Sequence, residues 1–167
     1  VNGDELPPVV IINPATSVQS RYYSRFADFL YAHGFNVITY DYRGIGGSRP
    51  ENMRGFQANW LDWGSKDFEG ILRFAGTCYK EHDILVAAHS VGGFLVGMAS
   101  SNHVIKRVFT MGSQFAYWRD YAKHKRFAMY LRWHIVMPTL TAIFGYFPGK
   151  RLGWLEDTPS GVVRDWI

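Results

Sequence analysis

The sequence predicts an α/β fold in which a parallel, doubly wound sheet is covered by helices on both faces. Short apolar runs rich in β-branched residues alternate along the chain with longer segments of helical spacing. The runs are continuously apolar, which is typical of strands buried on both faces of a parallel sheet. The 167 residues, of which 47% are hydrophobic and 19% charged, match the size and composition of one globular domain or a large part of one.

Four strands and three helices are expected in the first two thirds of the chain. The strands are residues 8–13, 35–40, 84–88 and 105–111, and the helices are residues 20–33, 63–79 and 91–101. Ser20 is a candidate cap for the first helix, and Gly34 stands where a left-handed residue would end it. Ligands of parallel sheets bind beyond the carboxyl ends of the strands, so the loops after the four strands are expected to hold the chemistry.

The composition changes after the fourth strand. Residues 115–149 are aromatic, basic and helical in spacing, with interruptions at Pro138 and at a Gly-Tyr-Phe-Pro-Gly stretch. No strand is expected in the remainder of the chain. We therefore expect two parts, with residues 1–114 as the sheet-bearing core and residues 115–167 as a helical cap over the strand ends.

The charge of the chain is uneven. It carries 18 Lys and Arg against 14 Asp and Glu, a net charge of +4, and all of the excess lies after residue 115. This distribution is compatible with attraction to an anionic substrate or membrane surface, and also with an ordinary solvated surface. Nucleic-acid binding is not expected, because the sequence has no recognition motif and no dense basic stripe. The single cysteine, Cys78, excludes an internal disulfide.

No transmembrane segment is expected. The longest nearly uncharged run, residues 133–148, has 16 residues and falls short of the ~20 residues of a spanning helix. A surface that touches a membrane without crossing it remains an alternative for this segment. The first residues are polar and do not resemble a signal peptide, so we expect a cytoplasmic protein. The six histidines lack metal-ligand spacing, so neither a metal nor a cofactor is expected, and the oligomeric state stays unknown.

The strongest functional motif lies where the third strand meets the following helix. The run Ala88-His89-Ser90-Val91-Gly92 has the pattern small-x-Ser-x-small, which is typical of a nucleophile elbow. A sharp strand-to-helix turn holds such a serine in a strained conformation and presents its Oγ above the sheet. Ala88 and Gly92 are expected to be small because their backbones pass close together. The alternative interpretation is a tight turn with an inert serine.

A glycine-rich loop follows the second strand and reads Asp41-Tyr42-Arg43-Gly44-Ile45-Gly46-Gly47-Ser48. Gly44 and Gly46 give the backbone freedom for a sharp turn. Asp41 and Arg43 are expected to fix the loop by hydrogen bonds or an ion pair. A phosphate cradle is the weaker interpretation, because the loop lacks the Lys-Ser/Thr ending of a P-loop and no helix follows directly.

Together the two motifs resemble the α/β-hydrolase superfamily, in which an Asp-x-Arg-Gly loop and a serine elbow follow successive strands. Three further stretches resemble a little-characterised group of bacterial predicted α/β-hydrolases. They are Asn-Pro-Ala-Thr at residues 13–16, Tyr-Trp-Arg-Asp at residues 117–120 and Phe-Gly-Tyr-Phe-Pro-Gly at residues 144–149. The resemblance covers nearly the whole chain.

The resemblance implies a serine hydrolase that cleaves a carboxylic ester or a related acyl bond. Ser90 would attack the carbonyl and form an acyl-enzyme, and the backbone N–H of Val91 would help to hold the oxyanion. A second N–H would come from Ala15, or alternatively from Thr16, since Pro14 has none. The aromatic cap implies a small-molecule substrate with an apolar or aromatic acyl group, unless these aromatic residues form the core of the cap itself.

The resemblance also implies a catalytic acid and a histidine on loops after later strands, and the sequence supplies neither. Within the sequence, His124 and His134 lie in the expected cap and could hang over Ser90, with Asp157 or Glu156 as a local acid. His89 is instead expected to be packed in the elbow. We therefore expect a chain truncated at both ends, with its acid and histidine beyond Ile167. Two alternatives stay open: acyl transfer at the same site, and a non-catalytic binding module that retains the fold.

Overall fold

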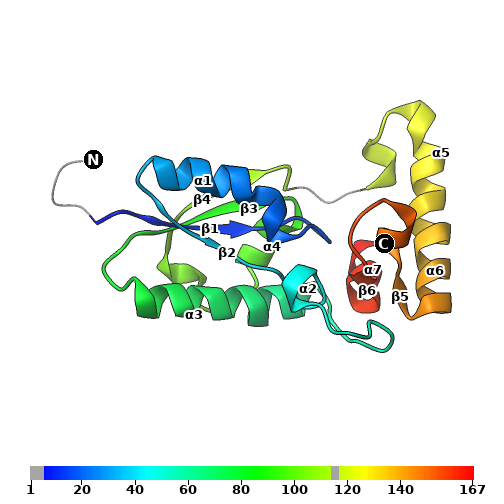
Figure 1. The fold of residues 1–167 in the computed structure, drawn as a ribbon. Coiled ribbons are helices and arrows are strands. Elements are labelled where there is room, and N and C mark those ends of the chain that lie inside the picture. Colours follow the sequence, from blue (N-terminus) through cyan, green and yellow to red (C-terminus); the bar gives the residue numbers. More distant parts are fainter. Residues whose placement is uncertain (1–5, 114–116) are drawn as a thin grey trace.

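The computed structural model describes residues 6–113 and 117–167 and contains a four-stranded sheet (Figure 1). The strands are β1 (Val9–Asn13), β2 (Asn36–Thr39), β3 (Ile84–His89) and β4 (Ile105–Met111). Their order across the sheet is β2-β1-β3-β4, and all three pairings are parallel. The predicted parallel α/β fold is therefore confirmed, and each strand lies within a residue of its expected bounds.

Helices lie on both faces of the sheet. Helix α1 (Ser24–Ala32) covers one face and α3 (Glu69–Cys78) the other (Figure 1). Val10 and Ile12 of β1 pack on the α1 side, whereas Ile11 packs on the α3 side. Because side chains alternate along a strand, this arrangement buries every residue of β1, as the continuous apolar run predicts.

The first expected helix is divided. Residues Ser20–Tyr23 form one turn of 3₁₀ helix, and α1 follows. The expectation that Ser20 caps the helix is wrong: its backbone N–H instead donates to the Asp41 carboxylate at 2.6 Å, and its side chain makes no capping hydrogen bond. Gly34, at φ +86°, adopts the left-handed conformation expected after the helix end.

The second expected helix begins three residues early. Helix α2 (Trp60–Asp62) runs through a π-helical segment, Trp63–Phe68, into α3. Asn59 starts it with a reciprocal capping box, in which the Asn59 side chain accepts from the Asp62 N–H and the Asp62 carboxylate accepts from the Asn59 N–H. The third helix, α4 (Val91–Val96), ends earlier than expected, at Gly97.

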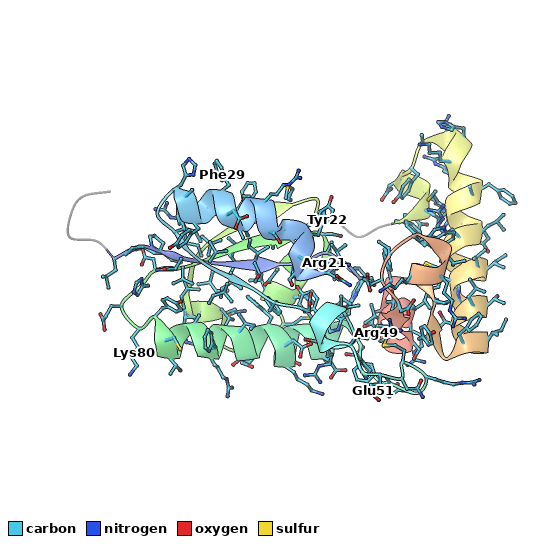
Figure 2. All side chains as sticks on the ribbon, in the orientation of Figure 1. Arg21, Tyr22, Phe29, Arg49, Glu51 and Lys80 are labelled. Carbon is cyan, nitrogen blue, oxygen red and sulfur yellow. The ribbon has the colours of Figure 1, made fainter. Side chains whose placement is uncertain are left out.

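Strand β4 differs from the expectation of a sheet covered on both sides. Six of its seven residues are exposed, and Phe109 is 63% exposed. Among the described residues, β4 pairs with β3 and has no strand along its other edge. Two exposed aromatic side chains lie in the same part of the chain. Phe29 of α1 points away from the sheet (Figure 2), and Tyr22, in the turn before α1, is 74% exposed.

Residues 117–167 lie beside the carboxyl ends of the strands (Figure 1), and we call this group of elements the cap. Its elements are α5 (Lys123–Leu131), a π-helical segment (Arg132–Val136), α6 (Met137–Phe144), β5 (Tyr146–Phe147), β6 (Thr158–Pro159) and α7 (Ser160–Trp166). The expectation of no strand after the fourth is wrong, because β5 and β6 pair antiparallel. Two-residue strands carry no periodicity that a sequence could display.

The cap has apolar packing of its own and is tied to the core. Trp133, Met137, Phe147 and Val163 form one buried cluster within it, while Val162 of α7 packs against core residues. No helix in the described ranges is long and apolar enough to cross a membrane.

Candidate active site

Ser90 stands alone between the last residue of β3 and the first residue of α4. Its backbone lies at φ +53° and ψ −122°, a conformation that is strained for any residue with a Cβ. Its N–H donates to the Met111 carbonyl at 2.9 Å, which ties the turn to the end of β4. Such strain persists only where the surrounding structure imposes it, and it is the geometry that the serine elbow motif predicts.

Close packing against the end of β1 imposes that turn. A Cβ on Gly92 would lie 2.6 Å from the Asn13 carbonyl oxygen, so only glycine fits there. The buried Asn13 side chain joins the two elements, since its Nδ2 donates to the Gly92 carbonyl at 3.1 Å and its Oδ1 accepts from the Tyr40 hydroxyl at 2.9 Å. Ala88, the other small residue of the motif, is buried beneath α3.

The glycine-rich loop after β2 is held by two separate carboxylates. Asp41 accepts from the Ser20 N–H and from the Gly47 N–H at 2.8 Å, and a Cβ on Gly46 would collide with that carboxylate. Arg43 instead pairs with Asp67 at 2.7 Å, and this hydrogen bond raises the Arg43 pKa. The expected hydrogen bonds and ion pair are both present, although Asp41 and Arg43 use different partners. Gly44, at φ +86°, uses the backbone freedom that was expected of the loop glycines.

The two expected oxyanion donors of the β1 loop differ in their surroundings. The Ala15 N–H donates to the buried Tyr23 hydroxyl at 2.9 Å and is therefore already paired. The Tyr23 oxygen also lies 2.8 Å from His89 Nδ1, and burial raises the Tyr23 pKa, which keeps this hydroxyl neutral. Thr16, the alternative donor, lines the same cavity as Ser90. Val91 N–H lies in the first turn of α4, where amides have no partner within the helix.

The cavity beside Ser90 lies between core and cap and has a volume of about 190 Å³. Its nine lining residues come from both parts: Thr16, Trp60, Ser90, Val91, Phe94, Gly112, Tyr121, Trp133 and Trp166. Five of them are aromatic, as the aromatic cap predicts, although two of the five belong to the core. Phe115, which belongs to the aromatic range 115–149 of the sequence, lies outside the described residues.

No imidazole or carboxylate is among the described residues that line this cavity. His124 and His134 are exposed on the cap helix.

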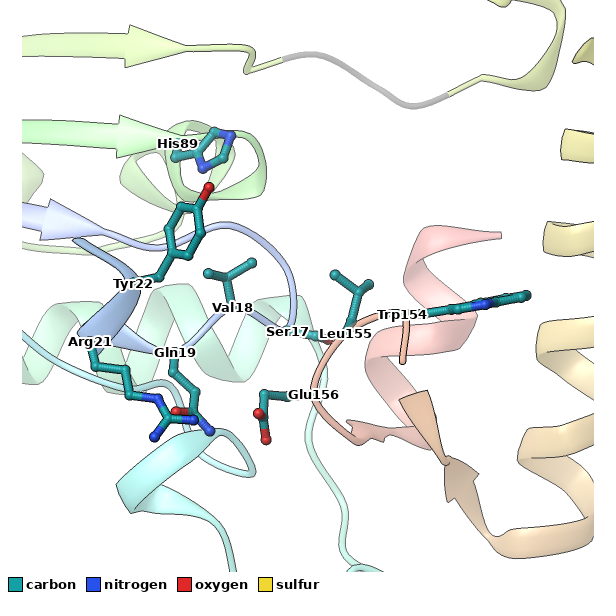
Figure 3. A pocket seen from close by; sticks show the side chains of 9 residues that line it. All are labelled: Ser17, Val18, Gln19, Arg21, Tyr22, His89, Trp154, Leu155 and Glu156. Carbon is teal, nitrogen blue, oxygen red and sulfur yellow. The ribbon is translucent and has the colours of Figure 1, made fainter. Parts of the chain in front are cut away.

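The expectation that His89 is packed in the elbow is wrong, because it is half-buried and lines a second pocket of about 650 Å³ (Figure 3). Glu156 lies across that pocket, whereas Asp157 pairs with Arg49 at 2.7 Å. Within the described ranges no three His, Cys, Asp or Glu side chains could share a metal.

Sequence reasoning missed several residues of this site. Trp60 enters the cavity because the Asn59 capping box starts the helix at that residue, and the Asn-x-x-Asp spacing was a readable signal. Trp166 arrives from α7, whose position depends on the β5–β6 pairing. Asn13 and Tyr23 act through contacts across the fold that no local pattern displays.

Solved structures resemble this fold at low sequence identity. A soluble variant of monoglyceride lipase from Saccharomyces cerevisiae, in complex with a substrate analogue, aligns with a TM-score of 0.63 and 18% identity over 85% of this chain and 46% of the other. A methylesterase from Arabidopsis gives 0.59 and 13% over 95% and 69%. An extracellular α/β-hydrolase from a Paenibacillus species gives 0.57 and 14% over 84% and 55%.

The chain thus spans about half the length of two of these proteins, 46% and 55% respectively. A comparison with curated proteins found no match by sequence. The family model described as serine aminopeptidase, S33, matches residues 6–145, which include both the glycine-rich loop and the Ser90 turn. The chain belongs to this S33 family of the α/β-hydrolase superfamily.

Proposed function

We propose that this protein is a serine hydrolase in which Ser90 attacks the carbonyl of a carboxylic ester. The observation that carries the proposal is the strained Ser90 turn at the mouth of a cavity between core and cap. In the reaction, Ser90 Oγ would bond to the carbonyl carbon, its proton would pass to a base, and the alcohol would leave with a proton. Water would then release the acid from the acyl-enzyme.

The oxyanion would be held by the backbone N–H of Val91 and by one N–H from the loop after β1. Helix α4 begins at Val91, so this amide has no acceptor within the helix and could donate to an oxyanion beside Ser90. Thr16 is the better second donor, because the Ala15 N–H is already paired with Tyr23. Ala15 could serve only if that hydrogen bond opened during the reaction.

The lining of the cavity supports an ester with an apolar or aromatic acyl group over a peptide with a free amino terminus. Five aromatic side chains surround the space, and none of its described lining residues carries a carboxylate that would pair with an ammonium group. Two of the structural relatives have names that specify ester cleavage, a monoglyceride lipase and a methylesterase.

The proposal requires a histidine that reaches Ser90 and an acid that orients it. The described residues place neither in the Ser90 cavity. We therefore propose that both come from outside residues 1–167 in the complete protein.

A fluorophosphonate probe tests the nucleophile in the complete protein. We expect labelling that Ser90→Ala abolishes and that Ser24→Ala, a change at an exposed serine of α1, leaves intact. If the complete, folded protein is not labelled, the catalytic proposal is wrong and the binding-module alternative is favoured. New ester formed from an added alcohol would instead identify acyl transfer at the same serine.

A further inference from the structure

One long helix forms the outer edge of the cap. Helix α5, the π-helical segment Arg132–Val136 and α6 are continuous over 22 residues, and α7, β5 and β6 lie on the side that faces the sheet (Figure 1). Its inner face is marked by Trp133, Met137 and Thr141, which are buried and recur every four residues.

The opposite face of this helix is apolar and exposed. Phe127, Ile135 and Ile143 are 72%, 49% and 60% exposed, and they recur every eight residues. In a regular α-helix, eight residues advance about 80° beyond two full turns. The π-helical segment Arg132–Val136 has more residues per turn and takes up part of this rotation. The three side chains therefore stand on the same side of the helix and extend for about 24 Å along it. We call these three residues the outer row.

The helix that carries the outer row, together with the turn before it, is rich in cations that have no carboxylate partner in the part of the chain that the structure describes. Residues 117–144 contain five Lys or Arg and one Asp, which equals the net charge of +4 of the whole chain. Within the described residues, none of these five cations forms a salt bridge, whereas Arg43, Arg49, Lys66, Arg73, Lys106 and Lys150 do. Lys123 and Lys125 also lie in the first turn of α5, where the helix dipole disfavours positive charge.

We propose that the outer row and these cations dock on an anionic lipid bilayer. An apolar row of this length enters the boundary between headgroups and acyl chains, and flanking Lys and Arg side chains contact the lipid phosphates. A protein partner with an acidic groove is the less favoured occupant, because the outer row is spread along the convex outer edge of the cap rather than gathered in one compact patch (Figure 1).

A bilayer docked on the outer row would lie close to the Ser90 cavity. Trp133, on the inner face of the same helix, lines the Ser90 cavity. A bilayer on the outer face would therefore lie one helix diameter, roughly 10 Å, from that cavity. This consequence rests on the proposed function, whereas the docking itself does not.

Vesicle co-sedimentation of the complete protein tests the proposal. We expect binding to phosphatidylcholine vesicles that contain phosphatidylglycerol, weaker binding to phosphatidylcholine alone, and release by added salt. The triple variant Phe127→Ser, Ile135→Ser, Ile143→Ser should weaken binding by about tenfold or more. The pair Lys123→Glu and Lys125→Glu should do the same by removing and reversing charge.

The matched control changes exposed aromatic residues of the core, Phe29→Ser and Phe74→Ser, and should bind as the unchanged protein does. Circular dichroism shows whether each variant keeps its helices.

Equal binding by the folded triple variant and the unchanged protein would overturn the proposal, as would no binding to the anionic vesicles. Self-association that the triple variant abolishes, in the absence of lipid, would assign the outer row to a second copy instead. Labelling of Ser90 is measured in parallel, so a failure of docking stays distinct from a failure of the hydrolase proposal.

Discussion

The core side and the cap side of the Ser90 cavity are built in different ways. On the core side, Gly92 and Asn13 bring two backbone segments into contact, and buried hydrogen bonds join them. On the cap side, Trp133 and Trp166 reach the cavity from helices that pack largely on one another. The position of the serine is therefore set by the backbone, whereas the shape of the pocket is set by side chains that can vary with the substrate.

Gly92→Ala should give the largest effect, because it attacks the core side directly. The new methyl group would meet the backbone of Asn13 at 2.6 Å, which neither element can avoid without moving. We expect a loss of about 3 kcal/mol in the free energy of unfolding, measured by urea denaturation. Gly97→Ala is the control, since the nearest atom would lie at an ordinary 3.6 Å. Equal stability of the two variants would contradict the close packing.

Asn13→Ala removes the hydrogen bonds on the same side without adding bulk. The Gly92 carbonyl and the Tyr40 hydroxyl would lose their partner in a buried place. We expect a loss of about 2 kcal/mol from these unsatisfied groups. The comparison variant is Asn102→Ala, whose side chain makes an exposed hydrogen bond to Val96. A loss no greater than that of Asn102→Ala would show that water replaces the Asn13 contacts.

Gly161→Ala tests the junction between cap and core. A Cβ there would collide with the Ala58 carbonyl, so α7 must shift. We expect a loss of about 1–2 kcal/mol, with amide exchange faster in the cap and unchanged in the sheet. Gly70→Ala, in open space on α3, should instead stabilise the protein slightly. Faster amide exchange throughout the sheet would mean that the cap and the core do not open independently.

Glu69, on α3 and away from the Ser90 cavity, makes the core sensitive to acid. The Ser101 hydroxyl and N–H donate to its carboxylate, Arg73 pairs with it, and together they lower its pKa from 4.5 to about 2. The stabilisation is fully present above pH 4.5 and is lost as the pH falls towards 2, because the unfolded chain takes up the proton first. Glu69→Gln should therefore flatten the dependence of unfolding free energy on pH in that interval. An unchanged slope would contradict the assignment.

The core was predictable from the sequence because its signals are local. Continuous apolar runs mark β1 and β3, and the Ala88-x-Ser90-x-Gly92 spacing marks the turn between β3 and α4. The exposed β4 was not predictable, since the same apolar run suits a central strand or an edge strand.

The cap and the contacts that Tyr23 makes behind the site were not predictable, because they depend on pairing between distant parts of the chain. The two-residue strands β5 and β6 leave no pattern, yet they place α7 and hence Trp166 at the cavity. The Tyr23 hydroxyl that occupies the Ala15 N–H comes from a turn eight residues away, and its partner His89 comes from β3. Sequence spacing could name both candidate donors but could not show which was already paired.

Trapping of an acyl-enzyme tests the central claim most directly. The complete protein is incubated with an activated aromatic ester, quenched in acid, digested and analysed by mass spectrometry. We predict that the peptide containing Ser90 gains the mass of the acyl group, and that the Ser90→Ala protein shows no such peptide. Acylation at another residue, or ester turnover by Ser90→Ala at the unchanged rate, would contradict the account.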